Sequence, residues 1–118
     1  MDRQAARLIL LLVWALWAHD QRFTNLTDTG WDAESSTWTL LGSSSTEAAC
    51  RDALRERIEA VAKEAVVPHV EVHYLVRGGD TIEFYFTPRP PLLATVSAQV
   101  LRYVCLPGAV DPRKGRPS

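Results

Sequence analysis

The stretch VEVHYLVRGGDTIEFYFT, residues 70–87, decides the fold of this chain. Val70, Val72 and Tyr74 alternate with polar residues in the first half, and Phe84 and Phe86 do so in the second half. Alternation of this kind is typical of strands that have one buried face. Because Arg-Gly-Gly-Asp separates the two halves, the stretch predicts an antiparallel hairpin.

The register of this hairpin follows from its loop. A loop of two glycines would place the apolar residues of the two strands on opposite faces of the sheet. A three-residue loop, Gly78 to Asp80, instead pairs Val76 with Ile82, Tyr74 with Phe84 and Val72 with Phe86. We therefore expect the three-residue loop, in which glycine supplies the positive φ.

Before the hairpin lies SSSTEAACRDALRERIEAVAKEAV, residues 43–66, which predicts a helix. Ser44 and Glu47 have the spacing of a capping box. One face carries apolar residues at helical spacing, and Pro68 ends the pattern. These residues are Cys50, Leu54, Ile58, Val61 and Ala65.

Two further strands are predicted, one on each side. STWTLLG, residues 36–42, alternates and stops at Gly42, and VLRYVC, residues 100–105, places Leu101, Tyr103 and Cys105 on one face. The proline-rich residues 87–99 are expected to form a crossing segment. The sequence thus predicts an α+β domain over residues 37–106, with about four antiparallel strands in the order β-α-β-β-β and one helix on one face.

The first eighteen residues are expected to form a signal peptide. Leu8 to Ala18 is an uncharged, mostly apolar run whose helix would span about 16 Å, half of a hydrocarbon core of about 30 Å. Cleavage after Ala18 would start the mature chain at His19, with residues 19–36 as a polar leader. An uncleaved membrane anchor and a buried helix of the domain are the alternatives.

The two cysteines, Cys50 and Cys105, are expected to form a disulfide between the helix and the last strand. A crosslink across about 55 residues contributes roughly 4 kcal/mol in the chain-entropy model. Disulfides persist after export, so this pairing and the signal peptide support each other. Two buried free thiols, or a redox pair, remain the alternatives.

No group of residues predicts catalysis, a metal or a cofactor. His69, Glu71 and His73 alternate along one strand, but the two histidines would stand about 13 Å apart, too far to share one zinc ion. Gly42 to Thr46 lacks the second glycine of a nucleophile elbow. We therefore expect no enzyme, no cofactor and no metal site.

The net charge of the chain indicates which classes of partner it can bind. The formal net charge is −1, which gives no basic footprint for nucleic acid. Residues 107–118 form a Pro/Gly-rich tail with Arg113, Lys114 and Arg116, which is expected to be solvated. We therefore expect no nucleic-acid partner, and contact with a membrane only through an uncleaved N-terminal segment.

The chain also resembles a family of small exported bacterial proteins of uncharacterised function. The resemblance covers roughly residues 37–115 and is carried by a tryptophan strand, a cysteine helix and a terminal Cys-Leu-Pro, spacer, Val-Asp-Pro-Arg motif. The matching positions are Trp38, Cys50, Cys105, Leu106, Pro107, Val110, Asp111, Pro112 and Arg113. The spacer Gly108-Ala109 departs from the acidic spacer common in that family. The resemblance implies a periplasmic or secreted setting.

Together these features predict an exported, disulfide-stapled module that binds an unknown protein or envelope component. A membrane-anchored accessory subunit with an uncleaved N-terminal segment is the alternative.

Overall fold

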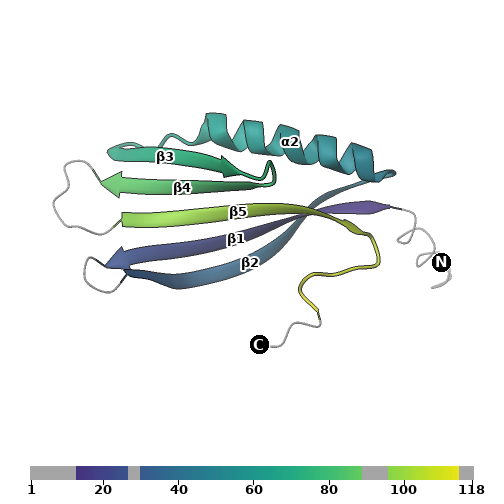
Figure 1. Cartoon of the computed structure of the whole chain (residues 1–118), viewed down its shortest axis with the longest axis horizontal. Helices are drawn as coiled ribbons and strands as arrows, with labels where there is room; N and C mark the ends of the chain where they lie inside the picture. Colours follow the sequence, from purple (N-terminus) through teal and green to yellow (C-terminus); the bar gives the residue numbers. More distant parts are fainter. Residues whose placement is uncertain (1–12, 27–29, 89–95, 115–118) are drawn as a thin grey trace.

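The computed structural model describes residues 13–26, 30–88 and 96–114. These residues form one antiparallel sheet of five strands and one helix (Figure 1). The elements are β1 (Trp14–Leu26), β2 (Gly30–Ser44), α2 (Glu47–Glu64), β3 (Val70–Arg77), β4 (Thr81–Pro88) and β5 (Val96–Pro107). The predicted α+β class is confirmed, with five strands where about four were expected.

The strands lie in the order β2-β1-β5-β4-β3, so β1 and β5 are neighbours inside the sheet although they come from opposite ends of the sequence. The chain passes from the β2 edge to the β3 edge through α2, which lies along one face of the sheet (Figure 1). We call the sheet surface under α2 the helix face and the opposite surface the open face. Part of the expected crossing segment, residues 89–95, lies outside the described residues, and its last four residues belong to β5.

The β3-β4 hairpin has the predicted register. Val76 pairs with Ile82, Tyr74 with Phe84 and Val72 with Phe86. Both glycines of the loop have positive φ, 62° at Gly78 and 74° at Gly79. The three-residue loop therefore keeps the apolar side chains of both strands on the helix face.

Helix α2 buries the predicted face but begins with a different cap. Cys50, Leu54 and Ile58 are buried against the sheet. Thr46 is the N-cap residue, and its Oγ1 accepts a hydrogen bond from the Ala49 amide at 3.1 Å. The predicted Ser44 capping box is therefore wrong, since Ser44 is the last residue of β2.

The core lies between α2 and the helix face. Its buried members come from α2 and from three strands, β1, β4 and β5. They are Leu16, Ala18, Cys50, Leu54, Ile58, Ile82, Phe84 and Tyr103. Ile82 and Cys50 are fully buried, at the centre of this layer.

Strand β1 corrects the predicted domain boundaries. Residues 14–18, expected in the signal peptide, and residues 19–26 of the expected leader form one strand that pairs with β2 and β5. Residues 30–36 of the leader belong to β2. The element order is β-β-α-β-β-β, and the sheet extends over residues 14–107 instead of 37–106. The physical reason is that residues 15–18 are buried on both faces of the sheet, which makes their sequence continuously apolar.

Among the residues that the structure describes, no helix is long and apolar enough to cross a membrane.

Candidate functional site

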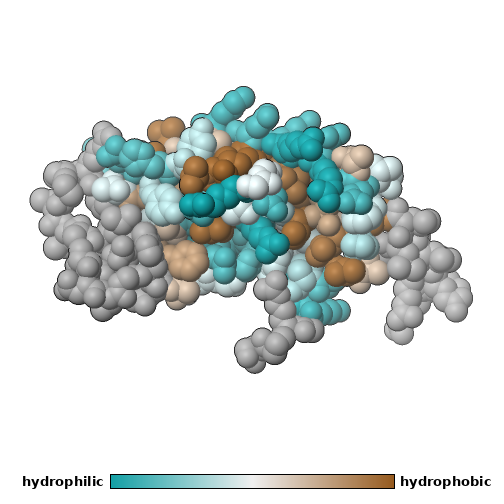
Figure 2. All heavy atoms as spheres, viewed as in Figure 1, coloured by the Kyte–Doolittle hydropathy of each residue, from teal (hydrophilic) through white to brown (hydrophobic). Residues whose placement is uncertain are grey.

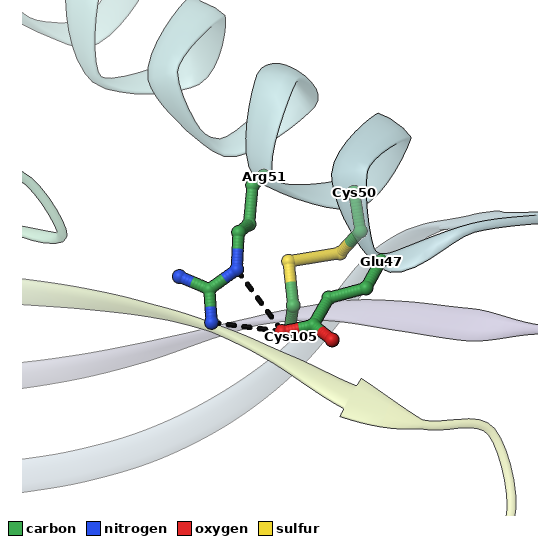
Figure 3. Close-up of polar contacts among 4 residues, drawn as sticks. All are labelled: Glu47, Cys50, Arg51 and Cys105. Carbon is green, nitrogen blue, oxygen red and sulfur yellow. Dashed lines mark hydrogen bonds and ion pairs between the residues drawn. A yellow bond between two sulfur atoms is a disulfide. The ribbon is translucent and has the colours of Figure 1, made fainter.

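The disulfide fixes one end of α2 to the sheet. Cys50, in the first turns of α2, is bonded to Cys105 of β5, and their Cα atoms are 6.0 Å apart (Figure 3). Cys105 pairs with Leu16, so the crosslink reaches the β1-β5 interior of the sheet. This confirms the predicted pairing of Cys50 and Cys105 and excludes two free thiols in this structure.

An ion pair lies beside the disulfide. The Arg51 guanidinium donates two hydrogen bonds to Oε1 of Glu47, at 3.1 Å from Nε and 2.8 Å from Nη2 (Figure 3). Both side chains are about half exposed or more, so the pair contributes little to stability. This pair joins two charged side chains of the same helix at spacing i to i+4.

The C-terminal segment folds back over the open face. The Gly108 amide donates to the carbonyl of Val13 at 2.8 Å, and the Arg113 guanidinium lies 5.0 Å from the centre of the Trp17 ring. This arrangement is a cation–π contact. Trp17 is only 5% exposed. The Arg113 side chain stays 59% exposed and Lys114 is exposed, so this segment is solvated while it contacts the sheet. Residues 115–118 lie outside the described residues.

Asp111 holds Arg113 in this position. Its carboxylate accepts hydrogen bonds from Nε of Arg113 at 3.0 Å and from Nη2 at 2.8 Å, and also from the Arg113 amide at 2.9 Å. The side-chain hydrogen bonds from Arg113 are the main reason that the pKa of Asp111 falls from 3.8 to about 2. Val-Asp-Pro-Arg is thus a structural clamp over Trp17.

The clamp predicts a specific pH dependence. Because the pKa of Asp111 is lower in the folded chain than in the unfolded one, the clamp stabilises the tail above pH 3.8 and is lost as the pH falls through about 2. Carbon-13 NMR of the Asp111 carboxyl should give a midpoint near pH 2. In an Arg113→Lys variant, which lacks the planar fork, the midpoint should rise toward 3.8. A midpoint that is equal in both proteins would contradict the clamp.

A second aromatic contact lies on the open face, next to Trp17. The His19 ring stacks on Trp38 with centroids 4.3 Å apart and an interplanar angle of 14°. Nε2 of His19 is 2.6 Å from Oγ of Ser36. His19 is 92% buried by these neighbours (8% exposed), so it acts as a packing residue between β1 and β2.

The polar residues considered on β3 do not form one row. His69 has φ 61° and lies before β3, outside the strand alternation expected for it. His73 is within 3.0 Å of the Glu71 carboxylate, and both are on the exposed surface of the strand. Within the described ranges, no three His, Cys, Asp or Glu side chains are grouped so that they could hold a metal ion.

A shallow apolar surface lies at the other end of α2 from the disulfide. A groove of about 310 Å³ runs between the last turns of α2, the residues after it, and the helix face of β4 and β5. Val61, Ala65, Val66, Val67, Phe84, Phe86 and Leu101 supply its apolar lining. Apolar side chains gather between α2 and the strands in Figure 2, framed by polar side chains of the helix. We call this feature the α2 groove.

Two polar side chains, Glu64 and Gln99, complete the lining of the α2 groove. Gln99 donates through Nε2 to Oδ2 of Asp20 at 3.0 Å, which orients the amide and leaves its carbonyl oxygen as an acceptor. The Glu64 carboxylate is also an acceptor at neutral pH. The groove therefore offers apolar contacts together with acceptors for N–H donors.

The rim of the α2 groove is unusually exposed for apolar residues. Val66 is 82% exposed and Val67 42% exposed, directly after the helix ends at Glu64. A backbone bond from the Val66 amide to the Glu64 carbonyl, 2.8 Å long, turns the chain there. Together with the groove, these two valines form a continuous apolar surface.

No family model, curated protein or solved structure matches the chain.

Sequence reasoning located the disulfide but missed the clamp and the groove. The sequence places Trp17 in the expected signal peptide and Arg113 in the expected solvated tail, so it does not predict their contact. Residues 14–18 are apolar throughout, so no alternation marks them as a strand. The groove had no local signal, because its lining comes from three separate parts of the chain.

Proposed function

We propose that this protein is an exported, disulfide-stapled interaction module that binds an extended apolar segment of a partner protein, in the envelope or outside the cell. We propose further that it acts without catalysis, cofactor or nucleic acid. The α2 groove is the observation that carries this proposal, because it combines apolar walls with acceptor groups at Glu64 and Gln99.

An extended peptide fits this combination of groups. Its side chains can fill the apolar lining, while its backbone amides supply donors for the Gln99 carbonyl and the Glu64 carboxylate. A volume of about 310 Å³ is enough for two or three apolar side chains but not for a folded domain. The fixed end of α2 at Cys50 supports a preformed groove, which lowers the entropic cost of binding.

Export is supported by the disulfide and by the apolar N-terminal run. Disulfides of small domains persist in oxidising compartments. Because residues 14–18 are part of β1, we propose that any signal cleavage falls before Trp14 and not after Ala18. In the alternative function, an anchored accessory subunit, the segment before Trp14 is retained and the same groove faces a membrane-associated partner.

Selection of linear peptides displayed on phage, with the oxidised protein as bait, tests the groove. We expect enriched sequences to carry apolar residues at alternating positions. Val66→Lys should weaken their binding at least tenfold, about 1.4 kcal/mol, because a lysine replaces an apolar contact at the rim. Since Val66 is 82% exposed, this variant should keep its fold.

Val110→Lys is the matched control, since Val110 is also an exposed valine, at 45%, but belongs to the C-terminal segment. It should bind the selected peptides like the wild type. Equal losses in the two variants, or selected peptides that bind Val66→Lys with unchanged affinity, would contradict a site in the α2 groove.

A further inference from the structure

The two edges of the sheet are built differently. Edge strand β2 carries two register shifts against β1: Trp17 pairs with Leu40 and Leu16 with Gly42, and Phe23 pairs with Ala33 and Arg22 with Ser35. Residues 34 and 41 are thus extra residues in β2. Such bulges bend and twist an edge and so discourage pairing with another strand.

The other edge, β3, has none of these protections. Every residue from Val70 to Arg77 pairs with β4 in unbroken register, and the strand contains no proline and no lysine. In the described part of the sheet, β3 is the last strand on this side. Tyr74, Leu75 and Val76 in its second half are 54%, 46% and 40% exposed. An edge in unbroken register with exposed apolar side chains is a template for strand addition.

We propose that β3 pairs antiparallel with β3 of a second copy of this chain, so that two sheets join into one. This inference goes beyond the proposed function, since it uses the edge of the sheet and not the α2 groove. A two-fold axis through Tyr74 places Glu71 opposite Arg77 of the second copy, Val72 opposite Val76, and His73 opposite Leu75. Glu71 and Arg77 then form two symmetric pairs of opposite charge.

Neighbouring registers lack this complementarity. An axis through His73 places Glu71 opposite Leu75 and the two His73 side chains opposite each other. An axis through Leu75 places His73 opposite Arg77, two groups that carry like charge when histidine is protonated. A two-fold axis that passes between two neighbouring residues of β3 is excluded. It would pair a side chain on the helix face of one copy with a side chain on the open face of the other.

The charges on the open face extend the same pattern. Within one chain, Nε of Arg77 is 2.7 Å from Oε1 of Glu83, and Nε2 of His73 is 3.0 Å from Oε1 of Glu71. Pairing across the two-fold axis sets Glu83, Arg77 and the Glu71 of the second copy in a row of alternating charge. The helix face adds apolar contacts between Val72 and Val76 and between the two Tyr74 rings.

Sedimentation equilibrium of the oxidised 118-residue chain tests the pairing. Because one strand pair makes a small interface, we expect a monomer–dimer equilibrium with a Kd of roughly 1–100 μM. Leu75→Lys should remove the dimer, because a lysine on the edge opposes strand addition. Leu40→Lys is the matched control, since Leu40 is 55% exposed on the other edge strand, and it should leave the dimer intact.

A charge exchange tests the register. Glu71→Arg alone and Arg77→Glu alone each place like charges opposite each other in a homodimer, so each should weaken dimerisation about tenfold or more. In a mixture of the two variants, both symmetric positions become opposite in charge again. Native mass spectrometry, with one variant labelled with nitrogen-15, should therefore show mixed dimers well in excess of the share that random pairing of the two variants gives.

Three results would overturn the proposal: a wild-type chain that stays monomeric up to roughly 1 mM, loss of the dimer in Leu40→Lys with retention in Leu75→Lys, or mixed dimers no more abundant than random pairing of the two variants gives. Circular dichroism of each variant establishes that its fold is retained. Should Arg77→Glu fail to fold because it loses Glu83, the two leucine variants still decide the question.

Discussion

A chain that begins at His19 will fail to form the sheet. It lacks Trp14 to Ala18, which pair with β2 on one side and β5 on the other. Leu16 and Trp17 are 7% and 5% exposed, and burial of two such side chains contributes about 3–6 kcal/mol. Since small domains are stable by only about 5–15 kcal/mol, this loss and the missing backbone pairs should leave the chain unfolded.

The control is a chain that begins at Val13, which keeps the whole of β1 and the Val13 carbonyl that accepts from Gly108. Far-ultraviolet circular dichroism during heating of the two oxidised chains makes the comparison. We expect a cooperative transition only in the longer chain. A cooperative transition in the His19 chain within a few degrees of the control would show that residues 14–18 are dispensable, as a signal peptide cleaved after Ala18 requires.

Removal of the disulfide should have the second largest effect. The bond joins residues 55 positions apart and so lowers the conformational entropy of the unfolded chain. In the chain-entropy model, its loss reduces the free energy of unfolding by about 4 kcal/mol. The double variant Cys50→Ala, Cys105→Ala is the appropriate replacement, because Cys50 is fully buried and serine would bury an additional hydroxyl. We expect the free energy of unfolding in urea to fall by roughly 2–5 kcal/mol.

The wild type in the presence of a reductant provides the comparison for this variant. Both proteins lack the crosslink, so both should unfold at similar urea concentrations, well below that of the oxidised wild type. If the alanine variant were as stable as the oxidised wild type to within about 0.5 kcal/mol, the crosslink would not be a significant source of stability.

The elements that sequence predicted well are those with one buried face. In α2, the spacing of Cys50, Leu54 and Ile58 matches one face of a helix, and that face is buried. In the β3-β4 hairpin, strict alternation and two glycines were enough to establish the register. The disulfide followed from α2 and from the alternation of Leu101, Tyr103 and Cys105 in the last strand, which placed both cysteines on the same side of the sheet.

Strand β1 was missed because both of its faces are buried near its start. Leu16 and Ala18 lie under α2 on the helix face, and Trp17 lies under Arg113 on the open face. A strand buried on both faces loses its alternation and becomes a continuous apolar run. Over eleven residues, such a run cannot be distinguished from the core of a signal peptide by hydropathy alone.

The clamp was missed for a related reason. The sequence places Arg113 in an expected solvated tail. Its partners in the structure are Asp111, two residues before it, and Trp17, nearly a hundred residues earlier. Local sequence suggests the first partner but not the second. Once β1 is recognised, Trp17 on the open face requires a cover, and the nearest chain is the segment after Pro107, which pairs with Trp14.

The proposed fold in the cell requires that the Cys50–Cys105 disulfide is formed and that the mature chain includes the whole of β1. Intact-mass measurement under non-reducing conditions, on protein recovered from producing cells, tests both parts at once. We predict a chain that starts at or before Trp14 and weighs two hydrogen atoms less than its reduced form. A chain that starts at His19, or one whose mass shows two free thiols, would contradict the account.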